Sequence, residues 1–153
     1  MVGLGDTAGA VGKGLFAGAA GTVAMTASST LEAKLRGRGS SSAPADAAGK
    51  VLGVQPRNPA GTARFSTVVH WSYGTSWGAV RGLLHAAGID GPVAVAAHFA
   101  AVWGSAQVML PALDVAPPPW KSDPAEIAID ALHHAVYAIA TAMAFTALEE
   151  GSS

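Results

Sequence analysis

The stretch GPVAVAAHFAAVWGSAQVMLPAL, residues 91–113, runs for 23 residues without a single charged side chain. Three other stretches are equally free of charge: residues 14–31, 65–80 and 131–148, of 18, 16 and 18 residues. A helix needs roughly 20 apolar residues to cross a hydrocarbon core about 30 Å thick. A helix on the surface of a soluble protein instead places charges on its wet face every turn or two. The four stretches therefore predict an all-α fold, a four-helix transmembrane bundle.

The composition of the whole chain agrees with this prediction. Charged residues make up 12% of the 153 residues, about half the share usual in globular proteins, and the mean hydropathy is +0.36. Alanine supplies much of that hydropathy, so a soluble, alanine-rich helical bundle is the alternative, although its outer faces need more charges than this chain has. A net charge of −1 gives no basic field for nucleic acid. The absence of cysteine excludes disulfides and thiolate chemistry.

The boundaries of the predicted helices follow from Pro, Gly and capping residues. We expect one domain over residues 1–153, with helices at about 11–35, 64–87, 91–113 and 124–150. A loop rich in Gly, Ser and Pro joins the first two helices, and a short helix inside it starts at Pro44 and ends near Gly53. The last helix opens on Asp123 as a cap, with Pro124 in its first turn and Glu126 positioned for a capping box.

Basic residues are unevenly divided between the two ends of the predicted bundle. One end carries seven of them: Lys34, Arg36, Arg38, Lys50, Arg57, Arg64 and Lys121. The other end carries only Lys13 and Arg81. By the positive-inside rule, the basic loop 34–64 lies in the cytoplasm and both termini lie outside a bacterial plasma membrane.

Small residues recur at steps of four along two of the helices. The first helix has Gly14, Gly18, Thr22 and Thr26, and the second has Gly74, Gly78 and Gly82. Helices in lipid gain little from hydrophobic association and pack where small residues let their backbones approach. This GxxxG pattern predicts a close contact between helices of one chain in preference to a dimer seam.

Ionisable groups inside a membrane are unfavourable, so they are the first place to look for function. The candidate intramembrane polar network is His70, Tyr73, Arg81, His98, Glu126, Asp130, His133, His134 and Tyr137. At a rise of about 1.5 Å per residue, His70 and Asp130 both lie about 9 Å from the same membrane face. We therefore expect these two side chains to pair, and Glu126 to lie nearer the surface, close to Arg64 and Glu32.

Several interpretations of this network are weighed against one another. The favoured one is that the polar groups satisfy one another across helices and fix their register. A proton- or ion-linked path through His70, Asp130 and His98, with His134 and Arg81, is the first alternative. A haem between two histidines, one of them His134, is a minor alternative, and a di-metal site has only the Asp130-x-x-His133 spacing in its favour. No catalytic motif occurs, and we expect no enzyme activity, no cofactor and no metal.

The chain resembles small multi-pass membrane proteins of actinobacteria and, more distantly, the YagU-like inner-membrane family. The resemblance rests on Gly14-Leu-Phe-Ala-Gly-Ala-Ala-Gly-Thr22 with the Leu35–Pro44 segment, on His70-x-x-Tyr73-Gly74-x-x-x-Gly78, and on His133-His-Ala-Val-Tyr137. It implies membrane residence and four helices, and it brings no catalytic residues.

The function predicted from these observations is that of a small accessory or scaffold protein of the plasma membrane. Its partners would be the lipid bilayer and, at the Lys34–Arg64 loop, an anionic lipid surface or a cytoplasmic protein. The alternative is a small transporter or proton-linked channel that uses the histidine and carboxylate residues.

Overall fold

The computed structural model describes residues 3–39 and 41–152, which are largely helical and contain no strand. The helices are α1 (Leu4–Leu35), α2 (Ala43–Leu52), α3 (Pro59–Ala86), α4 (Gly91–Ala112) and α5 (Pro124–Glu150), with a single 3₁₀ turn, η1 (Pro119–Lys121), before α5. The predicted all-α class is therefore confirmed. Four of the α-helices are long, and the fifth, α2, is the short helix expected inside the basic loop.

Local capping explains where the helices begin. α1 starts earlier than expected, and the Asp6 carboxylate accepts a hydrogen bond from the Gly3 N–H at 3.1 Å. α3 also starts earlier, because Asn58 Oδ1 accepts from the Gly61 N–H at 2.8 Å. α5 starts where predicted, with Asp123 Oδ1 accepting from the Ala125 N–H at 2.8 Å. These caps satisfy N–H groups that have no partner within the helix itself.

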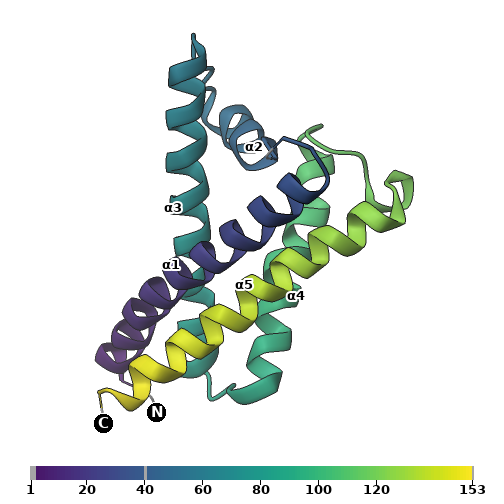
Figure 1. Ribbon diagram of the computed structural model, residues 1–153. Coiled ribbons are helices and arrows are strands. Elements are labelled where there is room, and N and C mark those ends of the chain that lie inside the picture. The colour runs from purple at the N-terminus through teal and green to yellow at the C-terminus, as the bar shows by residue number, and fades with distance from the viewer. Residues whose placement is uncertain (1–2, 40, 153) are drawn as a thin grey trace.

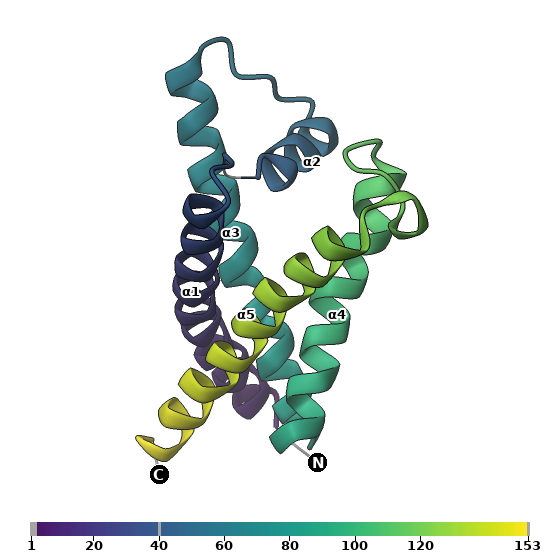
Figure 2. The same cartoon turned by 45° about the vertical axis from the view of Figure 1, so that its right-hand side comes forward.

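The four long helices alternate in direction along the chain. Figure 1 shows both chain ends at one end of the molecule, together with the α3–α4 turn, and α2 at the opposite end with the connection from α4 to α5. The first turns of α3 extend past the other long helices (Figure 2). The basic loop and the two chain ends thus lie at opposite ends of the helices.

The interior of the structure is built from small and polar residues. Among the described residues no Leu, Ile, Met or Trp is buried, and the largest fully buried side chains are Tyr137, Phe145, His98, Thr22 and Thr141. The large apolar side chains point outward instead: Phe16 is 76% exposed, Val108 72% and Met143 70%. A soluble protein places these residue types inside, so the packing is inverted relative to a soluble fold.

Glycines bring α1 and α3 into backbone contact, as the steps of four predict. A Cβ added at Gly18 would lie 2.7 Å from the Cα of Gly78, and one added at Gly14 would lie 3.0 Å from the Gly82 nitrogen. Gly74 faces Thr22 in the same way. The expected close contact between helices of one chain is therefore confirmed, and the structure shows that these two small-residue faces are the ones that meet.

Two helices, α4 and α5, are long and apolar enough to cross a membrane. Only 17% and 28% of their most apolar windows are buried, so neither resembles the core helix of a soluble protein. Within the described ranges, α1 and α3 do not reach the same hydropathy, because Gly, Ala, Ser and Thr make up much of α1, and α3 also carries His70 and Arg81.

Candidate functional site: the polar groups between the helices

The expected pairing of His70 with Asp130 is wrong. His70 Nε2 lies 2.8 Å from Thr26 Oγ1 on α1. The Asp130 carboxylate on α5 faces α4, where its Oδ2 accepts hydrogen bonds from Trp103 Nε1 at 2.9 Å and from Gln107 Nε2 at 3.1 Å. His134, one turn further along α5, donates from Nδ1 to the Asp130 carbonyl at 2.8 Å.

The position of α1 explains this outcome. Gly14 and Gly18 on one side of α1 contact α3, while Gly21 on another side faces α5, where a Cβ would lie 2.9 Å from the Tyr137 carbonyl oxygen. α1 therefore provides the surface against which both α3 and α5 pack. His70 meets Thr26 of α1 instead of reaching Asp130.

A double-mutant cycle tests this correction. We expect the effects of His70→Leu and Asp130→Leu on the free energy of unfolding to add within about 0.5 kcal/mol, as for residues that share no partner. His70→Leu and Thr26→Val should instead be coupled by about 1 kcal/mol, the net value of one hydrogen bond. Unfolding in mixed detergent micelles would provide both numbers, and coupling in the first cycle alone would contradict the structure.

The largest polar cluster lies at the end that carries the basic loop. Glu32 on α1 accepts hydrogen bonds from Arg36 and Arg38, and Arg36 also bonds to Glu126 at the start of α5. His133, which is buried, completes the cluster, with Nδ1 2.8 Å from Ser28 Oγ and Nε2 3.6 Å from Glu32. Glu126 thus lies beside Glu32, as expected, and ties α5 to the end of α1.

Glu32 is the carboxylate that both arginines of this cluster contact. Glu32 lies just beyond the uncharged stretch 14–31, and its hydrogen bond from Arg38, with a further one from Arg36, lowers its pKa from 4.5 to about 2. A group whose pKa is lowered on folding stabilises the fold above its unfolded pKa. That stabilisation is lost as the pH falls from about 4.5 toward 2.

We therefore expect Glu32→Gln to remove part of the acid sensitivity of the protein. In the unaltered chain the melting temperature should drop across this acidic range, and the variant should show a flatter curve because glutamine does not titrate. Asp114→Asn is the matched control, since Asp114 is exposed and its carboxylate forms no ion pair among the described residues. Thermal melts at a series of pH values would measure both, and a curve for Glu32→Gln identical to that of the control would refute the assignment.

Two aromatic groups occupy the centre of the bundle. His98 of α4 is completely buried and donates from Nε2 to the Trp77 carbonyl of α3 at 3.0 Å. Its ring lies 5.5 Å from that of Tyr137, whose hydroxyl donates to the Gly74 carbonyl of α3 at 2.6 Å. The Tyr73 ring lies edge-on to the Trp77 ring of its own helix. These bonds join α3, α4 and α5 at one level.

A third group lies at the end that holds both termini. Arg81 of α3 is buried, with Nη2 3.2 Å from Asp90 and its guanidinium 4.3 Å from the centre of the Phe145 ring. His85 bonds to the same carboxylate at 2.9 Å, and the hydrogen bonds from His85 and then Arg81 hold the pKa of Asp90 below its usual value. Lys13 pairs with Glu149 nearby.

The structure thus divides the nine predicted residues among separate groups instead of joining them in one network. Sequence reasoning gave no role to Ser28 and Trp103, which bind the predicted residues His133 and Asp130, or to His85, which shares the Asp90 carboxylate with Arg81. Ser28 lies on α1, which carries none of the nine predicted residues, and the role of His85 becomes clear only from its contact with Asp90. From the sequence alone Trp103 would be placed facing lipid, because its hydrogen-bond partner Asp130 lies on another helix.

These groups join neighbouring helices through hydrogen bonds and ion pairs, while some of their buried atoms, among them Arg81 Nε and Nη1 and His98 Nδ1, have no hydrogen-bond partner among the described residues. Among the residues described, no three His, Asp or Glu side chains lie close enough together to hold a metal ion. Comparisons with family models, with curated proteins and with solved structures found no match to this chain.

Proposed function

We propose that the protein is a four-pass integral membrane protein that serves as an accessory or scaffold protein. The observation that carries this proposal is the inverted packing, with small and polar residues inside and large apolar residues outside. Four long helices of 32, 28, 22 and 27 residues are each able to span a bilayer at 1.5 Å per residue. α1 and α3 are the less apolar pair, and they bury their glycine faces against each other.

The polar groups support a scaffold more than a proton-linked path. No hydrogen bond or ion pair among the described residues connects the Glu32 cluster with His98 or with Arg81. Each group instead joins two or three neighbouring helices, which is what fixing their register requires. The resemblance to small actinobacterial and YagU-like membrane proteins, with the same helix number, is part of this proposal.

The basic end is the proposed contact surface with the cytoplasm. Lys34, Arg57 and Arg64 are exposed there, and none of them has an ion-pair partner in the described ranges. Each unpaired basic side chain near an anionic leaflet contributes about 1 kcal/mol of attraction. An anionic lipid surface or an acidic face of a cytoplasmic protein would both fit this end.

Membrane residence is tested by fractionation. We expect the expressed protein to stay in the membrane pellet after washes with high salt and with alkaline carbonate, because apolar surface on α4 and α5 holds it in lipid. Release into the supernatant would refute the proposal. Orientation is tested with single cysteines in this cysteine-free chain and an impermeant maleimide added to intact cells. We expect Ser152→Cys to be labelled and Ser41→Cys to be protected.

A further inference from the structure

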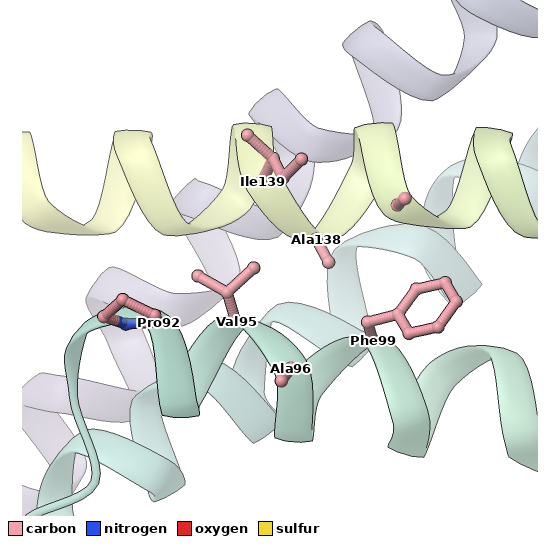
Figure 3. A pocket seen from close by; sticks show the side chains of 7 residues that line it. Pro92, Val95, Ala96, Phe99, Ala138 and Ile139 are labelled. Atoms are coloured by element: carbon pink, nitrogen blue, oxygen red, sulfur yellow. The ribbon is translucent and has the colours of Figure 1, made fainter.

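A shallow groove follows the seam between α4 and α5 and has two parts. The first part, of about 420 Å³, is lined by apolar side chains that include Val95, Ala96 and Phe99 of α4 and Ala138 and Ile139 of α5. Figure 3 shows Val95 and Ala138 directed toward each other between the two helices. We call the two parts together the α4–α5 groove.

The second part, of about 380 Å³, shares Val95 with the first and continues toward the end that holds the chain termini. Its lining includes one cationic residue, Arg81, and one carboxylate, Glu150. The Arg81 side chain is only 5% exposed, and its Nε and Nη1 have no hydrogen-bond partner among the described residues. Buried donors without a partner are unfavourable by about 1–3 kcal/mol, and more when the group is charged.

The length of the groove matches one leaflet of a bilayer. From Glu150 to Ala135 along α5 the distance is about 22 Å at 1.5 Å per residue. One leaflet with its headgroups measures about 20–22 Å, of which about 15 Å is hydrocarbon. The charged residues lie at the outer end of this length and the apolar residues at the inner end, in the order in which a phospholipid presents its headgroup and its acyl chain.

We propose that the α4–α5 groove binds one glycerophospholipid with a zwitterionic, amine-bearing headgroup, such as phosphatidylethanolamine. This inference rests on the proposed membrane residence. The lipid phosphate accepts hydrogen bonds from Arg81 in charge-assisted contacts. Its ammonium group donates to Glu150, and one acyl chain lies along Val95, Phe99 and Ile139.

The charges of the groove select among headgroups. Any phospholipid phosphate is able to contact Arg81, so Arg81 alone gives no selectivity. Glu150 repels an anionic headgroup, and a quaternary choline has no N–H to donate to it. A primary ammonium both cancels the carboxylate charge and donates a hydrogen bond, which is why we expect phosphatidylethanolamine to be preferred over phosphatidylcholine and phosphatidylglycerol.

The experiment uses the full chain in nanodiscs that contain equal amounts of these three lipids, followed by native mass spectrometry of the protein with its retained lipid. We expect one phosphatidylethanolamine per chain. Ala96→Phe, which fills the groove, should lower its retention about tenfold. Val93→Phe is the matched control, since Val93 lies on the same helix, is 68% exposed and does not line the groove, and retention should be unchanged. Glu150→Gln should reduce the preference for phosphatidylethanolamine over phosphatidylglycerol about fivefold while total lipid retention is maintained.

Several outcomes would overturn the proposal. Equal retention of all three lipids would show that the headgroup contacts do not select the lipid. Equal retention by Ala96→Phe and Val93→Phe would show that the lipid does not bind in the α4–α5 groove. A dimer that Ala96→Phe dissociates would assign the groove to a second copy of the chain. A chain that stays in carbonate-washed membranes but retains no lipid would refute this inference alone, whereas release by carbonate would refute the membrane proposal beneath it.

Discussion

Replacing Gly78 with alanine is expected to destabilise the protein by about 2–3 kcal/mol, the upper part of the range of about 1–3 kcal/mol for overpacking a tight contact. The added Cβ would meet the Gly14 carbonyl oxygen and would lie 2.7 Å from the Cα of Gly18. These are backbone atoms, so no side-chain rotation relieves the clash, and α1 and α3 must move apart. The separation would also loosen Gly74 from Thr22 one turn away.

The matched control is Gly104→Ala on α4. A Cβ at that position would meet nothing within 4 Å, and alanine favours a helix over glycine by about 0.8–1.0 kcal/mol. Both substitutions gain the same helix propensity, but only Gly78→Ala adds a clash with the neighbouring helix. Their effects on the free energy of unfolding should therefore have opposite signs. Equilibrium unfolding in mixed micelles would measure both. If Gly78→Ala were as stable as Gly104→Ala, the backbone contact between α1 and α3 would not exist.

The sequence predicted a close contact through these glycines, because spacing alone determines which residues share one face of a helix, but it did not identify which two helices meet. Gly14 and Gly18 fall on one face of their helix, and Gly74, Gly78 and Gly82 on one face of theirs, whatever the surrounding fold. A helix face made of small residues is the favourable place for a close contact in an apolar chain, since large side chains elsewhere would hold the two backbones apart.

The polar partners were harder to predict, because depth along an axis does not fix which helices are neighbours. His70 and Asp130 were expected to meet from their matched distances to one membrane face. The structure places α1 against both α3 and α5, and His70 meets Thr26 there. Asp130 faces Trp103 on α4 instead. Helix order depends on contacts between residues far apart in the chain, which hydropathy and spacing do not encode.

Tyr137 has contacts on all four long helices, and we expect its removal to have the largest effect of any single side chain. It belongs to α5, its hydroxyl bonds to Gly74 of α3, its ring lies against His98 of α4, and its Cδ2 is 3.0 Å from a Cβ built on Gly21 of α1. Only 2% of its surface is exposed. Tyr137→Ala should therefore destabilise the protein by about 3–5 kcal/mol, the range for truncating a buried aromatic residue.

Two further substitutions separate the packing of Tyr137 from its hydrogen bond. Tyr137→Phe keeps the ring and removes the hydroxyl with its bond to the Gly74 carbonyl, so we expect a loss of about 1 kcal/mol. Tyr73→Phe is the control, because the Tyr73 hydroxyl forms no hydrogen bond among the described residues and the ring that remains still contacts Trp77, so its loss in free energy of unfolding should be smaller than that of Tyr137→Phe. Comparable losses for Tyr137→Phe and Tyr137→Ala would mean that the hydroxyl, not the ring, joins the helices. Near-zero losses for both would require a helix order in which Tyr137 faces lipid, and the inverted packing would then lose its central residue.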